Sequence, residues 1–90
     1  MTPHARIYLD YFGLIESDVI LCEVCGKVGT DIHHIHGRGK GKDTISNLMC
    51  VCRLCHQKAH GGTKTYLHPD VMQAIHDTYV NNFLTNGVTH

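Results

Sequence analysis

The chain has 90 residues, of which 42% are hydrophobic, and its eight basic and eight acidic side chains cancel to a net charge of zero. This length allows one small domain with a marginal core, so a metal ion or disulfide bonds are expected to add stability. No apolar stretch is long enough to cross a membrane, and the first residues lack the pattern of a signal peptide. We therefore expect a cytoplasmic protein with reduced thiols.

The first predicted element is a helix over about residues 3–12. Thr2 is a favourable N-cap, Pro3 suits the first helical position, and Gly13 suits the C-terminal cap. Apolar residues recur at helical spacing between them. A short apolar run at 18–21 then enters the middle of the chain as a strand or an extended segment.

The rest of the chain is predicted to form a strand over 30–35, a basic loop over 37–42, and two helices over 52–60 and about 69–84. The last helix opens with proline and aspartate, which suit its first turn. The chain from Asn86 onward is expected to fray. The apolar stripe expected on the last helix consists of Val71, Met72, Ile75, Tyr79, Phe83 and Leu84.

Basic residues gather in the middle of the chain. Seven of the eight lie inside or beside the segment from Cys22 to His60, where Glu23, Asp31 and Asp43 oppose them. Such local positive charge suits a phosphate backbone, although an ordinary solvated face explains it equally well.

Four of the five cysteines form two Cys-x-x-Cys pairs, Cys22 with Cys25 and Cys52 with Cys55. Two thiol pairs at this separation have the ligand spacing of a tetrahedral zinc site. A disulfide framework is disfavoured by the expected compartment, and a redox pair by the lack of a thioredoxin-like pattern. We therefore expect a structural Zn²⁺ ion. Cys50 has no partner at such a spacing and is expected to be a buried packing residue.

The histidines indicate a second metal site. His56 and His60 lie one helical turn apart, so both rings project from one face. A third ligand from the cluster of His33, His34 and His36 would leave coordination positions open for water or substrate. Open positions are typical of a catalytic metal.

The residues HHIHGRG, then Asn47 and Leu48, then CRLCHQKAH resemble the HNH (His-Asn-His) endonucleases, including the subgroup with a zinc knuckle. The resemblance spans 22–60 and implies a small α+β fold. Its catalytic unit would be a ββα-metal (His-Me finger) unit with a four-cysteine zinc site, flanked by an N-terminal and a C-terminal helix. We expect residues 1–90 to form one nuclease domain around this motif.

The resemblance implies a role for each motif residue. His34 would be the general base, and Asn47 would brace the loop that carries it by bonding to backbone. His33, His56 and His60 would hold the catalytic divalent metal. The structural zinc would be held by Cys22, Cys25, Cys52 and Cys55.

Further expectations follow for metal and substrate. Three nitrogen ligands suit Zn²⁺, Mn²⁺, Ni²⁺ or Co²⁺ better than Mg²⁺. Asp31 either orients a ligand histidine or is an exposed strand charge. Arg38, Lys40 and Lys42 are expected to contact the DNA backbone, Arg38 above all because its guanidinium can bind a phosphate through two nitrogens.

Two functions remain open. The favoured one is a metal-dependent DNA endonuclease of a phage-like or bacterial kind, which nicks as a monomer or cuts both strands as a homodimer. The alternative is a non-catalytic zinc module that binds a nucleic acid or a protein. Such a module would not need an unligated His34 beside His33, or Asn47, so these residues favour the enzyme. DNA versus RNA, strandedness, sequence preference and the physiological metal stay open.

Overall fold

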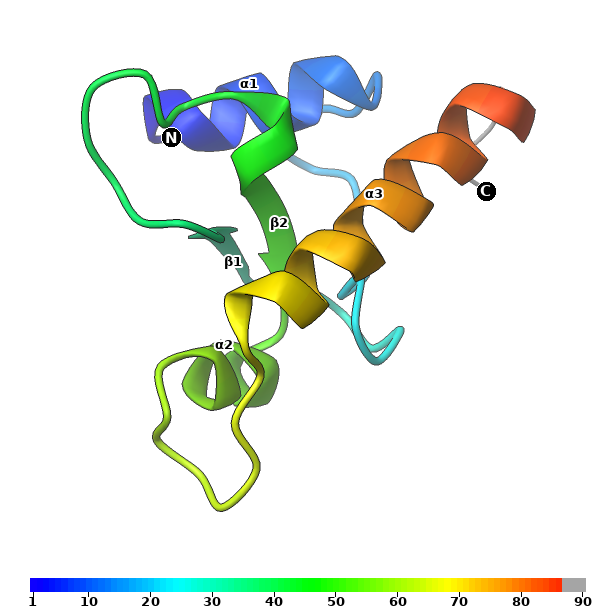
Figure 1. The fold of residues 1–90 in the computed structure, drawn as a ribbon. Coiled ribbons are helices and arrows are strands. Elements are labelled where there is room, and N and C mark those ends of the chain that lie inside the picture. The colour runs from blue at the N-terminus through cyan, green and yellow to red at the C-terminus, as the bar shows by residue number, and fades with distance from the viewer. Residues whose placement is uncertain (87–90) are drawn as a thin grey trace.

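The computed structural model describes residues 1–86, which form three α-helices, a short 3-10 helix and a two-stranded antiparallel sheet (Figure 1). The fold is therefore a small α+β fold, as predicted. Residues 87–90, where the sequence predicts fraying, lie outside the described part. The elements are α1 (Pro3–Tyr11), β1 (Asp31–His34), η1 (Ile45–Asn47), β2 (Leu48–Val51), α2 (Arg53–Ala59) and α3 (Pro69–Asn86).

Strand β2 is the centre of the molecule. It pairs with β1 so that His34 lies opposite Leu48, and its four side chains are at most 1% exposed. Successive side chains on a strand point to opposite faces. Met49 and Val51 accordingly join the apolar cluster that contains α2 and the start of α3, whereas Leu48 and Cys50 join the cluster beneath α1.

Helix α1 covers one of these clusters. Its N-cap is Thr2, whose hydroxyl accepts the N–H of Ala5, and Gly13 follows its end with a φ of 68°. Phe12 packs against two aromatic rings of α3, with centroids 5.5 Å from Tyr79 and 5.0 Å from Phe83. The predicted helix over 3–12 is confirmed, and its packing joins the two ends of the described chain.

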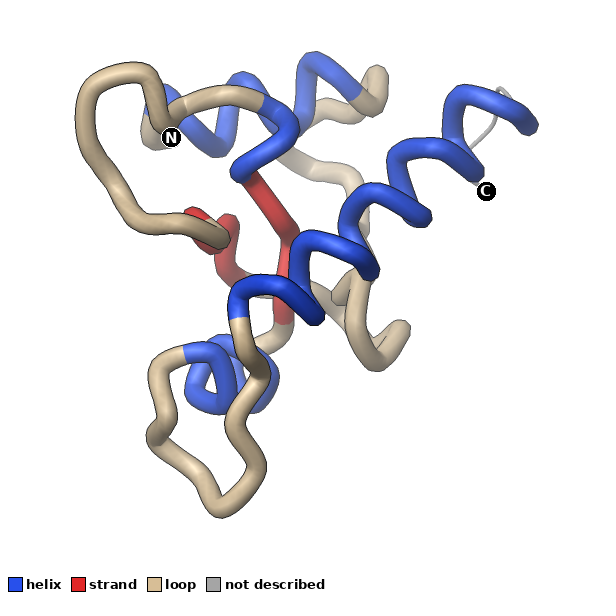
Figure 2. The backbone as a smooth tube through the Cα atoms, viewed as in Figure 1, coloured by secondary structure: helices blue, strands red, loops and turns tan. Residues whose placement is uncertain are grey.

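Helix α2 lies at the end of β2 on the other side of the sheet (Figure 1). Cys52 is its N-cap and His60 its C-cap, and Gly61 follows with a φ of 74°. The predicted helix over 52–60 is therefore confirmed to within a residue at each end. Loops make up the connections on both sides of β1, and these carry the first cysteine pair and the basic segment 37–42 (Figure 2).

The predicted apolar stripe of α3 is partly wrong. Val71 and Leu84 are 48% and 63% exposed, whereas Met72 is buried. The side of α3 that faces the core runs instead through Met72, His76 and Phe83. A search for apolar residues could not include His76, although it is fully buried. None of the helices in the described part of the chain is long and apolar enough to cross a membrane.

Candidate active site and metal centres

The four paired cysteines meet at one point. Cys22 and Cys25 flank a tight turn before β1, and Cys52 and Cys55 begin α2. Their sulfur atoms all lie within 4.8 Å of one another, and Sγ of Cys25 lies 3.7 Å from Sγ of Cys52. Tetrahedral zinc with Zn–S bonds of about 2.3 Å separates its sulfurs by about 3.8 Å. The cluster therefore fits a structural zinc ion.

Two thiols of this cluster differ in acidity, because burial raises the pKa of Cys55 whereas the pKa of Cys52 is lowered. All five cysteines are free in the structure, and four of them converge on one point, which favours a metal site over the disulfide alternative. The backbone N–H of Cys55 lowers the pKa of Cys52 to about 7, so the thiolate that binds zinc forms readily there. Cys50 differs, because burial raises its pKa to about 12 and it is 1% exposed. The prediction that Cys50 is a packing residue is confirmed.

Three histidines form a second cluster. The ring of His33 on β1 lies 4.9 Å from that of His56 and 5.3 Å from that of His60, measured between centroids, and the two α2 rings are 4.8 Å apart. One nitrogen of each lies within 4.8 Å of the others. Burial and the neighbouring histidines lower the pKa of His33 to about 4, so its imidazole is neutral and has a lone pair for a metal.

Asp31 fixes one ligand of this cluster. Its Oδ2 lies 2.7 Å from Nδ1 of His56, and its carboxylate also accepts a hydrogen bond from Arg53. The bond leaves Nε2 of His56 for a metal, which is the usual arrangement of carboxylate, histidine and metal. Of the two expectations for Asp31, the orienting one agrees with the structure. The donor set of three imidazoles, one oriented from behind, fits a divalent transition metal.

His34 lies apart from this cluster. Its ring contacts His4 of α1, with centroids 4.7 Å apart, and its Nε2 lies 2.7 Å from Oδ1 of Asp43. Adjacent positions on β1 thus direct His33 toward α2 and His34 toward α1 and the basic loop. Neither His4 nor Asp43 was expected at the site from the sequence. Asp43 lies only four residues before Asn47, so its closeness to the motif could have drawn attention to it. His4 is 30 positions from His34, and no local spacing predicts their contact.

Asn47 ties both ends of the basic loop together. Its Oδ1 accepts the N–H of His36 at 2.8 Å, and its Nδ2 donates to the carbonyls of Gly37 at 3.1 Å and Lys42 at 2.9 Å. The side chain is 7% exposed. Every one of these bonds goes to backbone.

The three clustered histidines and His34 share one cavity of about 330 Å³. Arg38 lines it, whereas Lys40 and Lys42 are exposed on the loop and Asn47 lies behind the loop. The structure therefore brings the metal cluster, the candidate base and one guanidinium around a single space. The lining residues are Ile32, His33, His34, Gly37, Arg38, His56 and His60.

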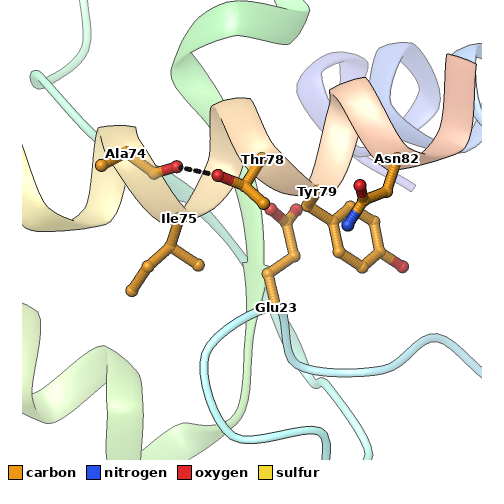
Figure 3. Close-up of a pocket in the computed structure, with 6 residues that line it drawn as sticks. All are labelled: Glu23, Ala74, Ile75, Thr78, Tyr79 and Asn82. Atoms are coloured by element: carbon orange, nitrogen blue, oxygen red, sulfur yellow. Dashed lines mark hydrogen bonds between the residues drawn. The ribbon is translucent and has the colours of Figure 1, made fainter. Parts of the chain in front are cut away.

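A second hollow of about 400 Å³ runs along α3 and offers less chemistry (Figure 3). The carboxylate of Glu23 at its floor is already bonded to Tyr8 and His76, and the hydroxyl of Thr78 donates to the carbonyl of Ala74. The remaining lining residues, Ile75, Tyr79 and Asn82, form no metal-ligand cluster there. The histidine cavity is therefore the candidate site.

Comparison with known proteins agrees with this site. Residues 22–62 match the family model described as HNH endonuclease. No curated protein and no solved structure matches the chain. The matched segment contains the four zinc-site cysteines, the three clustered histidines, His34 and Asn47. Over residues 22–62, somewhat less than half of its length, the chain is therefore similar to the HNH endonucleases.

Proposed function

We propose that this protein is a metal-dependent endonuclease that hydrolyses DNA phosphodiester bonds. The observation that carries the proposal is the shared cavity, in which His34 stands beside the three-histidine cluster without belonging to it. A general base must keep a free nitrogen, and a ligand cluster must keep an open side, so this separation is what hydrolysis needs.

The chemistry divides between a metal and the residues of the chain. A divalent metal on His33, His56 and His60 would supply positive charge for the phosphate and for the leaving 3′-oxygen. His34 takes a proton from the attacking water near neutral pH. Asn47 acts as a positioning residue, because it fixes the loop that faces His34. The nitrogen ligands favour Mn²⁺, Zn²⁺, Ni²⁺ or Co²⁺ over Mg²⁺.

The basic loop is the proposed contact with DNA. Arg38 lines the cavity and can bind the phosphate next to the one that is cut, whereas Lys40 and Lys42 extend the positive surface along the backbone. One cavity cuts one strand at a time. We therefore propose nicking by a monomer, and double-strand cleavage only by a homodimer or by two successive visits.

The zinc cluster and the flanking helices are proposed to support this site as one nuclease domain over 1–90. Zinc on the four cysteines would join the turn before β1 to the start of α2, which carries His56 and His60. Helices α1 and α3 both pack on the core around β2, so neither flank is a separate unit.

The test is nicking of a supercoiled plasmid with Mn²⁺, Mg²⁺, Zn²⁺ or EDTA. We expect wild-type protein to nick when metal is present, and His34→Ala to lose activity by about 100-fold or more with its zinc content unchanged. His68→Ala is the matched control, because this exposed histidine lies outside the cavity. Failure of the wild-type protein to cut with any metal, together with unimpaired DNA binding, would favour the zinc-binding module instead.

A further inference from the structure

We propose that Asp43 is a positioning residue for the general base: its carboxylate accepts the Nε2–H of His34, so that Nδ1 carries the lone pair that takes the proton from water. The proposal rests on the proposed function and deepens it, because it states which nitrogen of His34 acts and what holds that nitrogen ready. The carrying observation is the 2.7 Å separation between Nε2 of His34 and Oδ1 of Asp43.

The surroundings of His34 leave Nδ1 open. Within residues 1–86, every buried side-chain nitrogen and oxygen has a hydrogen-bond partner, and the bond found for His34 uses Nε2. Since Nδ1 has no partner there, it must have contact with solvent-accessible space. His34 is only 7% exposed as a residue and lines the cavity, so we assign the open side of this nitrogen to the cavity.

Asp43 is itself held by the loop brace. The carbonyl of Lys42, the residue before it, accepts a hydrogen bond of 2.9 Å from Nδ2 of Asn47. Thus the asparagine fixes the backbone that presents the carboxylate. On the other side, the ring of His4 packs edge-on against His34. The imidazole is confined from two directions, which limits its rotation.

The carboxylate has two effects on the reaction. It selects the tautomer with hydrogen on Nε2, and its negative charge stabilises the imidazolium that forms when Nδ1 gains a proton. In the proposed step, an O–H bond of water breaks and its proton goes to Nδ1. The oxygen forms a bond to phosphorus, and the P–O3′ bond breaks with its electron pair left on O3′, which a solvent proton then neutralises.

An inhibitory role of Asp43 would predict the opposite effect of its removal on activity. Asp43 is half-exposed, with 49% of its side chain accessible, so it could instead occupy the base until DNA displaces it. Removing the carboxylate would then raise activity. Under the positioning proposal, removal lowers the rate of the chemical step.

The kinetic test uses the zinc-loaded full chain with plasmid and Mn²⁺. Asp43→Ala is expected to lower kcat by about 10- to 100-fold while KM stays within about twofold. Asp43→Asn is expected to lose less, since its Oδ1 still accepts the Nε2–H but carries no charge. Asp10→Ala is the matched control, because it removes the same charge from an exposed position on α1. An unchanged or raised kcat in Asp43→Ala would overturn the proposal.

A second measurement does not depend on activity. Long-range ¹H–¹⁵N NMR on the zinc-loaded protein, at a pH where imidazole is neutral, reports which ring nitrogen of His34 carries hydrogen. We expect the Nε2–H form in wild type and a mixture of forms in Asp43→Ala. If either variant fails to bind zinc and fold, the wild-type tautomer alone decides: the Nδ1–H form rejects the proposal. Nicking with the Nδ1–H form would reject the role of Asp43 but keep the nuclease. The Nε2–H form without nicking would keep the contact but reject the nuclease.

Discussion

His76 of α3 and Glu23 of the first cysteine turn form a fully buried pair, with Nδ1 of the histidine 2.7 Å from Oε1 of the carboxylate. The other nitrogen, Nε2, lies 2.6 Å from the carbonyl oxygen of Ile45. Both partners are acceptors, so both nitrogens must donate and the imidazole is protonated. Through these bonds His76 connects α3 to Glu23, the residue after Cys22, and to η1, whose last residue is Asn47.

This pair makes stability depend on pH. Burial alone would lower the pKa of His76, but the hydrogen bond and charge of Glu23 outweigh it, and the pKa is raised. A raised pKa means that the folded state holds its proton more tightly than the unfolded chain. The stabilisation is therefore complete below about pH 6.5, the unfolded value, and is lost as pH rises through the folded pKa. Urea unfolding should show this decline in wild-type protein at neutral and higher pH.

His76→Gln provides the comparison. This variant leaves Glu23 buried without its charged partner and should cost about 3 kcal/mol at pH 6.5. The difference from wild type should shrink as the pH rises, since the wild-type histidine then loses its proton too. The zinc thiolates stay ionised in this range when metal is present and do not mask the trend. A difference that stays constant with pH would show that His76 is neutral in the fold.

Gly29 and Cys50 should be coupled in stability. A methyl group on Gly29 would overlap Sγ of Cys50, which is fixed on the buried strand β2. Gly29→Ala is therefore expected to cost about 2 kcal/mol of unfolding free energy, as overpacking does. In the background of Cys50→Ala the same change should cost less, by about 1 kcal/mol or more. Equal costs in the two backgrounds, measured by urea unfolding of zinc-loaded protein, would contradict the contact.

The clusters of the site could be predicted because their geometry is local. Two cysteines within one turn, or His56 and His60 within one helical turn, come together through backbone spacing alone. His33 was added by its place in the motif. The helix ends near Gly13 and Gly61 were also local signals, and the structure confirms both.

The rest depends on contacts between distant segments. His76 and Glu23 are 53 positions apart, and neither residue type indicates burial by itself. Because the burial of His76 was not foreseen, the predicted apolar stripe of α3 wrongly included Val71, which is exposed. His4 meets His34 only because α1 packs over the end of β1, which no local spacing encodes.

Asn47 should control the order of the basic loop. Asn47→Asp keeps the acceptor for the N–H of His36 but replaces the donors to Gly37 and Lys42 by oxygen, which the carbonyl groups repel. Trypsin is a suitable probe, because Arg38 lies inside the loop. We expect cleavage there about 10-fold faster than in wild type. Asn82→Asp, an exposed change of the same kind on α3, should cleave at the wild-type rate. Equal rates for the two variants would show that the brace does not order the loop.

The two metal clusters should be separable by substitution. Cys25→Ala removes a thiolate from the cluster that joins the turn before β1 to α2, and it should release the tight zinc and lower the melting temperature by roughly 10 °C or more. His60→Ala removes a ligand from the end of α2, where the residue is exposed, and should change the melting temperature by only about 2 °C. Cys25→Ala therefore tests the contribution of the cysteine cluster to stability, and His60→Ala tests metal binding at the cavity.

Metal content after dialysis against a weak chelator and then against Mn²⁺ would be measured by mass spectrometry. Wild-type protein should retain one zinc and take up one manganese, since sulfur ligands favour zinc and the open histidine cluster exchanges more readily. His60→Ala should retain the zinc and lose most of the manganese. Loss of zinc from His60→Ala would mean that the clusters bind metal as one unit. Retention of manganese by that variant would exclude the three-histidine site, because two imidazoles alone would then be sufficient.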